Sequence, residues 1–158
     1  VAAMNEGAAK LFHIDLSGDE RQITEVGELE GSDPRRLRCD LESGICAVSD
    51  FSGSRITILR WDGSSAPSIT DATAEGAIAK GPVGIDVFGR RIVSAGFDDN
   101  RYSILEVDEA GKIVSVTTKD LPEGCTKPGH AKFLRDAKNT VVVSCWESTG
   151  IAVIPEAF

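Results

Sequence analysis

The side chains best suited to acid–base chemistry in this sequence are His130 and Arg36. They end the tripeptides Pro128-Gly129-His130 and Pro34-Arg35-Arg36, which occupy the same place in two copies of a repeat. An imidazole changes protonation near neutral pH, and a guanidinium binds anions through several N–H donors. Together at the mouth of a channel, the two could hold an anionic ligand and transfer a proton. The alternative is that both are polar side chains that merely cap inner strands.

Three further residues are candidates for substrate binding: Arg35, Asp50 and Glu147. Arg35 adjoins Arg36, and the other two lie in polar loops that follow apolar strands. A third such loop, Asp98-Asp99-Asn100, could suggest calcium. It lacks the spaced carboxylates of a dedicated calcium loop, so a tight turn is the favoured interpretation. No motif for a metal, a nucleotide or another cofactor occurs, and we expect no cofactor.

A repeated unit must position these residues, and its clearest copy is the stretch 33–63. We predict three short antiparallel strands there, at Leu37–Leu41, Ile45–Ser49 and Arg55–Arg60. Tight turns join them, the first at Glu42-Ser43-Gly44. Short strands joined in this way form an antiparallel meander.

The same pattern returns in 81–111 and 127–154, and its second half opens the chain. Each full copy has proline at its second position, followed by two strands. The second of these strands ends on a Val-Ser pair, and a polar loop and an apolar strand come after it. The pairs are Val48-Ser49, Val93-Ser94 and Val143-Ser144, with Val1-Ala2 in their place in the opening copy. The repeat units therefore start near residues 1, 33, 81 and 127.

A period of about 40 to 50 residues with several short strands per unit is typical of a β-propeller blade. Outer fourth strands are expected at Gln22–Val26, Ser68–Thr70 and Ile113–Thr118, the last being rich in β-branched residues. The predicted fold class is all-β: blades of four-stranded antiparallel meanders, about three and a half of them, in a single domain over 1–158. A β-sandwich with coincidental spacing is the alternative.

The fourteen expected strands do not complete a ring, because propellers have at least about four blades. The first unit lacks its opening strand, and the last lacks its outer strand. Apolar faces and strand edges would then stay open at both ends. We therefore expect either further chain or a partner chain, such as the second copy of a homodimer, to complete the ring. Two copies would bring twenty-eight strands, the number in seven four-stranded blades.

The composition is that of a globular protein: 158 residues, 41% hydrophobic and 27% charged. The net charge of −8 argues against binding to nucleic acid or to an anionic membrane. No apolar run reaches the ~18 residues that cross a bilayer. No basic segment followed by an apolar run opens the sequence, so we expect no signal peptide and a cytoplasmic location.

The four cysteines leave two interpretations open. In a reducing compartment all four are small buried hydrophobic residues, which is the favoured interpretation. A hairpin with a two-residue turn would instead set Cys39 opposite Cys46, where a disulfide could form in a non-hydrogen-bonded pair. Cys125 and Cys145 lie in an inter-blade loop and a second strand. No CxxC-type spacing indicates a metal site.

The repeats resemble the seven-bladed propeller lactonase family, which includes bacterial 6-phosphogluconolactonases and the fungal carboxymuconate-lactonising enzyme. The likeness rests on Pro34-Arg35-Arg36 and Lys127-Pro128-Gly129-His130, which are similar to degenerate forms of that family's Pro-Arg-His. It rests also on VSDFSGSRITILRWDG at 48–63. The resemblance implies hydrolysis of a sugar lactone, with Arg36 orienting an anionic substrate and His130 activating water or relaying a proton.

Two functions therefore stay open. The first is a lactone hydrolase, or half a ring of one. The second is a non-catalytic propeller module that binds a protein or peptide through loop residues such as Phe97 or Trp146, because a fold does not by itself decide function. The expected partners are a small-molecule lactone or a protein, with a second chain to complete the ring.

Overall fold

The computed structural model describes residues 2–5, 9–15, 20–135, 139–148 and 150–155, without the side chains of 2–5. These residues form fourteen strands and no helix, so the predicted all-β class is confirmed. Within this described part of the chain, no helix has the length and apolar character needed to cross a membrane.

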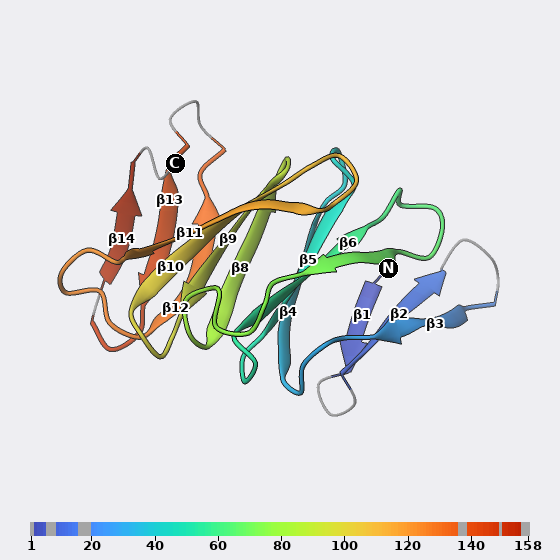
Figure 1. Cartoon of the computed structure of the whole chain (residues 1–158), viewed down its shortest axis with the longest axis horizontal. Coiled ribbons are helices and arrows are strands. Elements are labelled where there is room, and N and C mark those ends of the chain that lie inside the picture. Colours follow the sequence, from blue (N-terminus) through green and yellow to red (C-terminus); the bar gives the residue numbers. More distant parts are fainter. Residues whose placement is uncertain (1, 6–8, 16–19, 136–138, 149, 156–158) are drawn as a thin grey trace.

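The strands form four antiparallel sheets, which we call the first to fourth blades and which stand side by side like a fan (Figure 1). The first blade contains β1 (Ala2–Asn5), β2 (Lys10–Asp15) and β3 (Gln22–Glu28). The second contains β4 (Pro34–Asp40), β5 (Ile45–Asp50), β6 (Arg55–Arg60) and β7 (Ser68–Ala72). The third contains β8 (Pro82–Phe88), β9 (Arg91–Gly96), β10 (Arg101–Val107) and β11 (Ile113–Asp120). The fourth contains β12 (Pro128–Phe133), β13 (Val141–Cys145) and β14 (Gly150–Ile154).

The strands of each blade follow one another in chain order, and the outermost strand of one blade leads to the innermost strand of the next. Because β3 leads to β4 in this way, β1 to β3 correspond to the second to fourth strands of a blade, and the described residues include no innermost strand before them. The same residues include three strands of the fourth blade and none after β14. The predicted strand number is therefore confirmed. Two copies of this chain would bring eight sheets, four of them three-stranded.

Each innermost strand begins at a predicted proline, where the missing N–H costs no sheet hydrogen bond. These prolines are Pro34, Pro82 and Pro128. A bulge follows each of them: in β4, Pro34 pairs with Asp50 and Arg36 with Ser49, which leaves Arg35 as an extra residue. The same shift follows the other two prolines. A bulge re-aims the side chains that come after it, so it sets which of them share a face.

The strand pairing corrects one detail of the repeat alignment. The third residue after each proline lies opposite Val48 in β5 and Val143 in β13, but opposite Ser94 in β9. Val93-Ser94 is thus one position out of register with the other Val-Ser pairs. The turn at 89–90 that joins β8 to β9 is also shorter than the corresponding turns.

The hydrophobic core lies between the blades. Ile56 and Ile58 of the second blade pack with Ile85 and Val87 of the third, and all four are buried. Similar clusters join the first blade to the second and the third to the fourth. Burying such a side chain stabilises a fold by about 1.5–3 kcal/mol. The contact between neighbouring blades therefore holds the inner strands in place.

Both cysteine pairs are disulfides, which corrects the interpretation of four free thiols. Cys39–Cys46 joins directly opposed residues of β4 and β5, in the register that the two-residue turn predicted. Cys125–Cys145 joins the connection between the third and fourth blades to β13. The sequence does not predict this second bridge, because the contact between a loop and a strand depends on how the blade closes.

Candidate functional site

Three equivalent residues, one from each innermost strand, form a row along the inner edge of the blades: Arg36, Gly84 and His130. β8 lies between β4 and β12, so Gly84 is the middle member of the row. Arg36 Nη2 lies 3.5 Å from His130 Nε2, although the two residues are 94 positions apart in the chain. The fold thus brings together the two residues that the sequence predicts as catalytic.

Gly84 makes this approach possible. A Cβ placed on Gly84 would lie 2.5 Å from His130 Cα and 2.6 Å from Ala131 N, closer than real Cβ atoms come. Since both neighbours are backbone atoms, neither can turn aside. The bare backbone of β8 therefore lets β12 pack tightly against it, and it places no side chain between Arg36 and His130.

A second row lies two residues further along the same strands and holds Arg38, Asp86 and Lys132. Asp86 is buried, and its carboxylate accepts hydrogen bonds from Lys132 Nζ at 2.9 Å and from the Phe133 N–H at 3.1 Å. Arg38 donates to the Leu37 carbonyl at 3.0 Å. Sequence analysis missed this row. The sequence does contain the information needed to predict it. Alternate residues of a strand share a face, and each member of the second row lies two residues after a member of the first row.

The two rows make the surroundings of His130 positive. Partial burial lowers the pKa of His130, and three nearby positive charges lower it further. The three are Arg36, Arg38 and Lys132. At neutral pH the imidazole is therefore uncharged, and a lone pair on one ring nitrogen can accept a proton. An uncharged base beside guanidinium groups suits a reaction that moves a proton next to a bound anion.

The other three candidate residues lie apart from this pair. Arg35 forms an ion pair with Asp33 at 2.8 Å, and its guanidinium lies 5.3 Å from the centre of the Phe51 ring. Glu147 is exposed in the turn between β13 and β14. Within the described part of the chain, no hydrogen bond or ion pair links Arg35 or Glu147 to His130. Both remain predicted substrate-binding residues that are outside the inner-edge rows.

Asp50 is enclosed in its own loop. Its side chain is only 3% exposed, and its two oxygens accept the N–H of Asp33 at 2.7 Å and of Gly53 at 2.6 Å. Carboxylates that accept backbone N–H groups in this way hold turns in shape. The geometry therefore gives Asp50 a structural role in its own loop, while its contact with substrate stays a prediction.

Replacing Asp50 with alanine is expected to lower the free energy of unfolding by about 1–3 kcal/mol for each N–H that loses its acceptor. Urea unfolding followed by tryptophan fluorescence measures this loss. Asp50→Asn is the matched control, because its amide oxygen still accepts one of the two hydrogen bonds and should preserve part of the stability. An Asp50→Ala protein as stable as the parent would contradict the structural role.

The Asp98-Asp99-Asn100 loop behaves as a turn, as the favoured interpretation expected. Asp99 Oδ2 accepts from the Lys80 N–H at 3.0 Å and from Arg101 at 2.6 Å, while Asp98 lies 3.9 Å from Lys127 Nζ. Both carboxylates thus face cations and backbone donors of the chain itself. Among the described residues, no group of three or more His, Cys, Asp or Glu side chains could hold a metal ion.

A row of aromatic rings follows the middle strands of three blades. Phe51, Phe97 and Trp146 each come directly after the residue that pairs with the blade's proline. The ring centres are 6.4 Å apart for Phe51 and Phe97 and 5.8 Å apart for Phe97 and Trp146. Trp146 is 64% exposed. This aromatic row is a second surface to which a ligand could bind.

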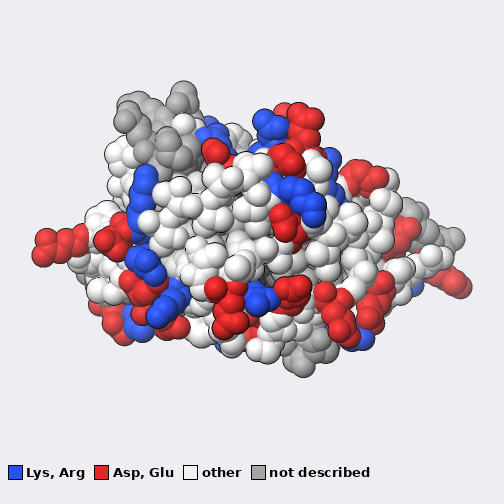
Figure 2. Space-filling model, viewed as in Figure 1, with Lys and Arg blue, Asp and Glu red and all other residues white. Residues whose placement is uncertain are grey.

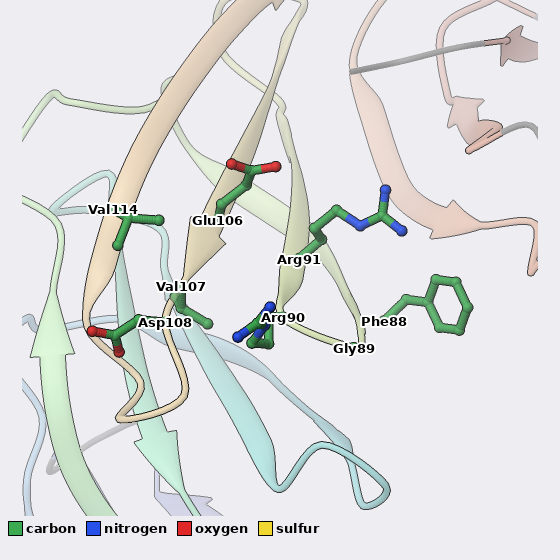
Figure 3. A pocket seen from close by; sticks show the side chains of 8 residues that line it. All are labelled: Phe88, Gly89, Arg90, Arg91, Glu106, Val107, Asp108 and Val114. Carbon is green, nitrogen blue, oxygen red and sulfur yellow. The ribbon is translucent and has the colours of Figure 1, made fainter.

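A cavity of about 600 Å³ lies elsewhere, around the turn between β8 and β9 (Figure 3). Arg90 and Arg91 line it on one side and Glu106 and Asp108 on the other. None of the five candidate residues from the sequence lines it. Opposite charges around an open hollow neutralise one another, so this cavity offers no acid–base group comparable to His130.

The inner rows differ in charge from the chain as a whole, whose net charge is −8. On the face shown in Figure 2, Asp and Glu side chains gather along the lower edge and at both ends. The inner rows instead combine two arginines, a lysine and a histidine with one buried carboxylate. The site is therefore a local basic patch on an acidic protein, which would draw an anionic ligand toward the inner edge.

No family model matches the chain, and no curated protein matches it. Solved structures do. The periplasmic gluconolactonase PpgL of Pseudomonas aeruginosa is 18% identical, with a TM-score of 0.69 over 98% of this chain and 48% of that one. A proposed 6-phosphogluconolactonase of Bacteroides uniformis is 17% identical, with a TM-score of 0.79 over 96% of this chain and 46% of that one. The β-propeller domain of Myceliophteria thermophila Cps50 (Swd1) is 12% identical, with a TM-score of 0.65 over 93% of this chain and 47% of that one.

The chain folds as half of a β-propeller. It spans slightly under half the length of each of these three chains. At such low identity the likeness establishes the fold alone, and the half-propeller shares that fold with lactonases and with the Swd1 domain. Any activity must therefore be argued from the residues of its own inner edge.

Proposed function

We propose that the half-propeller, once completed to a ring, hydrolyses a sugar lactone with His130 and Arg36. The observation that carries the proposal is the 3.5 Å approach of Arg36 Nη2 to His130 Nε2, beside further cations that lower the pKa of His130. Gluconolactonase and 6-phosphogluconolactonase are named among the chains of similar fold, which supports the same reaction class.

In this proposal His130 is the general base. Water attacks the lactone carbonyl carbon while the imidazole takes one of its protons. The ring C–O bond then breaks, and the departing oxygen takes the proton back from the imidazolium, which yields the open hydroxy acid. Because the pKa of His130 is lowered, the ring is uncharged and ready to accept a proton at neutral pH.

Arg36 binds the anionic group of the substrate and also controls the base. A guanidinium only donates hydrogen bonds, so in the contact with Arg36 the Nε2 atom of His130 is the acceptor. A carboxylate or phosphate on the substrate competes for Arg36, because charge-assisted hydrogen bonds are stronger than neutral ones. Binding of an anionic lactone therefore turns Arg36 toward the ligand and frees the Nε2 lone pair for water.

The direct test is hydrolysis of 6-phosphogluconolactone and of uncharged gluconolactone by the protein and by its Arg36→Ala variant. Losing a hydrogen bond to a charged group costs about 1.5–3 kcal/mol, so KM for the phosphorylated lactone should rise about 10- to 100-fold. KM for gluconolactone should change much less. Arg21→Ala, an exposed change in the first blade, is the control and should leave both values unchanged. Absence of turnover with either lactone would remove the proposed activity.

The aromatic row supports a second function, a binding module for a protein or peptide. Aromatic side chains are enriched at recognition surfaces, and the Trp146 ring is 64% exposed. Arg35 and Lys127 lie along the same row, with their charges facing the half-buried Phe51 and Phe97 rings. This function predicts no lactone turnover. It also predicts that partner binding tolerates His130→Ala and Arg36→Ala but fails with Trp146→Ala.

A further inference from the structure

The outer face of the fourth blade exposes residues whose counterparts are buried in the third. Ile151 pairs with Ser144 as Tyr102 pairs with Ala95, yet Ile151 is 68% exposed and Tyr102 only 3%. Val153 is 57% exposed, whereas its counterpart Ile104 is 4% exposed. The third blade buries these positions against the fourth. The fourth blade therefore presents the same kind of packing face with nothing against it.

The aromatic row supports the same conclusion. Phe97 of the third blade lies under the Lys127 ammonium of the next connection, with 4.7 Å from Nζ to the ring centre. Phe51 of the second blade likewise adjoins Gly81 of the next. Trp146 holds the corresponding place in the fourth blade and is 64% exposed. The rings of Phe51 and Phe97 are thus each next to the blade that follows. Among the described residues, no following blade lies against Trp146.

The opposite end of the chain has a complementary open face. Leu11 of β2 is fully buried against the second blade, so strand alternation turns Phe12 to the outer face. Ile23 of β3 is 67% exposed. The counterparts of Phe12 in the second and third blades, Thr57 and Ser103, are buried. Among the described residues, no blade packs on the outer face of the first blade, and none packs on that of the fourth.

The two ends also differ in charge. Residues 20–30 at the first blade contain four glutamates and one arginine. Residues 127–135 at the fourth blade contain two lysines, an arginine and a histidine, with no acidic residue. The two lysines already lie near carboxylates of the third blade, Lys132 at 2.9 Å from Asp86 and Lys127 at 3.9 Å from Asp98, so the contrast in charge is partial. An acidic end and a basic end of the same chain attract each other between copies and disfavour contact between like ends.

We propose that two copies of this chain associate head to tail, with the outer face of the fourth blade of each copy packed on the outer face of the first blade of the other. Two such contacts related by a two-fold axis close a ring of eight sheets, which is within the usual range of propellers. The contact repeats the blade-to-blade packing already present three times in the chain.

This closure completes the candidate site. His130 and Lys132 lie on the innermost strand of the fourth blade, where the first blade of the second copy arrives. Because the described residues include no innermost strand in that first blade, the inner edge beside His130 stays open to the channel. Each ring would then have two equivalent sites that open to the channel. Each site would lie between the His130 imidazole of one copy and the first blade of the other copy.

The test is the solution mass by light scattering, measured without substrate so that its outcome is independent of lactone hydrolysis. The chain has a mass of 16.8 kDa, and the proposal predicts twice that value. Ile151→Asp on the fourth blade and Ile23→Asp on the first should each weaken association, since each places a charge in both contacts of the ring. Val114→Asp is the control: Val114 is 62% exposed on the outermost strand of the third blade, away from either contact.

Mixing the two variants separates head-to-tail contact from other arrangements. In a mixed pair, one contact carries both new charges and the other carries none, so the mixture should recover part of the two-copy mass. A parent chain that stays monomeric at all concentrations would overturn the proposal. So would assemblies larger than two copies, or a mixture that recovers nothing, which would indicate contact between like ends.

Discussion

Replacing His130 with alanine is expected to lower kcat/KM for hydrolysis of 6-phosphogluconolactone about 100- to 10,000-fold, the usual contribution of a positioned general base. The loss should fall mainly on kcat, because Arg36 remains to bind the anion. His13→Gln is the matched control: His13 lies in β2 of the first blade and packs edge-on against Trp61, with ring centres 6.0 Å apart. Equal rates for His130→Ala and the parent would remove His130 from the mechanism.

The pH dependence provides a second measurement of the same role. His130 acts only when neutral, so kcat/KM should be constant at neutral pH and fall as the pH drops through the lowered pKa of His130. The fall should therefore come at a lower pH than for an ordinary histidine. Lys132→Met removes one of the nearby positive charges, so it should raise the pKa of His130 and move the fall to higher pH. An unchanged profile would contradict this assignment.

Replacing Gly84 with valine is expected to lower the free energy of unfolding by about 1–3 kcal/mol and to separate Arg36 from His130. The added Cβ would lie 2.5 Å from His130 Cα, so β12 has to move away from β8. Urea unfolding measures the first effect. The second appears as a change in the pKa of His130, followed by NMR, toward the ordinary histidine value as Arg36 withdraws.

Gly150→Val is the control for this change. Gly150 also lies in a strand, but a Cβ there would meet no atom within 4 Å, so the same added atoms should cost little. If Gly84→Val were as stable as Gly150→Val and left the pKa of His130 unchanged, the close approach of β8 and β12 would not be what brings the two residues together.

Much of the fold could be predicted because it repeats. Three copies of proline, strand, turn and strand indicated the blades, and Arg55–Arg60 has the predicted bounds. The inner and outer strands run beyond their predictions: β4 begins at Pro34 instead of Leu37, and β7 continues to Ala72. Sheet pairing decides these ends, and a polar or proline residue that pairs with a neighbour carries no apolar signal in the sequence.

The candidate site could be predicted only in part. Equivalent positions in the repeat were enough to place Arg36 beside His130. Nothing in the sequence distinguished Asp50, which its own loop encloses, from a carboxylate that is free to bind a ligand. The ion pair between Asp86 and Lys132 depends on the distance between two blades, which the sequence does not give. The role of Gly84 depends likewise on the position of the β12 backbone against β8.

The two disulfides decide how the protein should be produced and stored. A bridge of this kind commonly adds about 2–4 kcal/mol to stability, and the longer loop, closed by Cys125 and Cys145 20 residues apart, should contribute more than the hairpin bridge. Such bridges form and persist in oxidising compartments, so the buffer used for the protein should contain no reductant. Protein purified from a reducing host, or kept with a thiol reagent, would lack both bridges, and its connection between the third and fourth blades would be the first part to loosen.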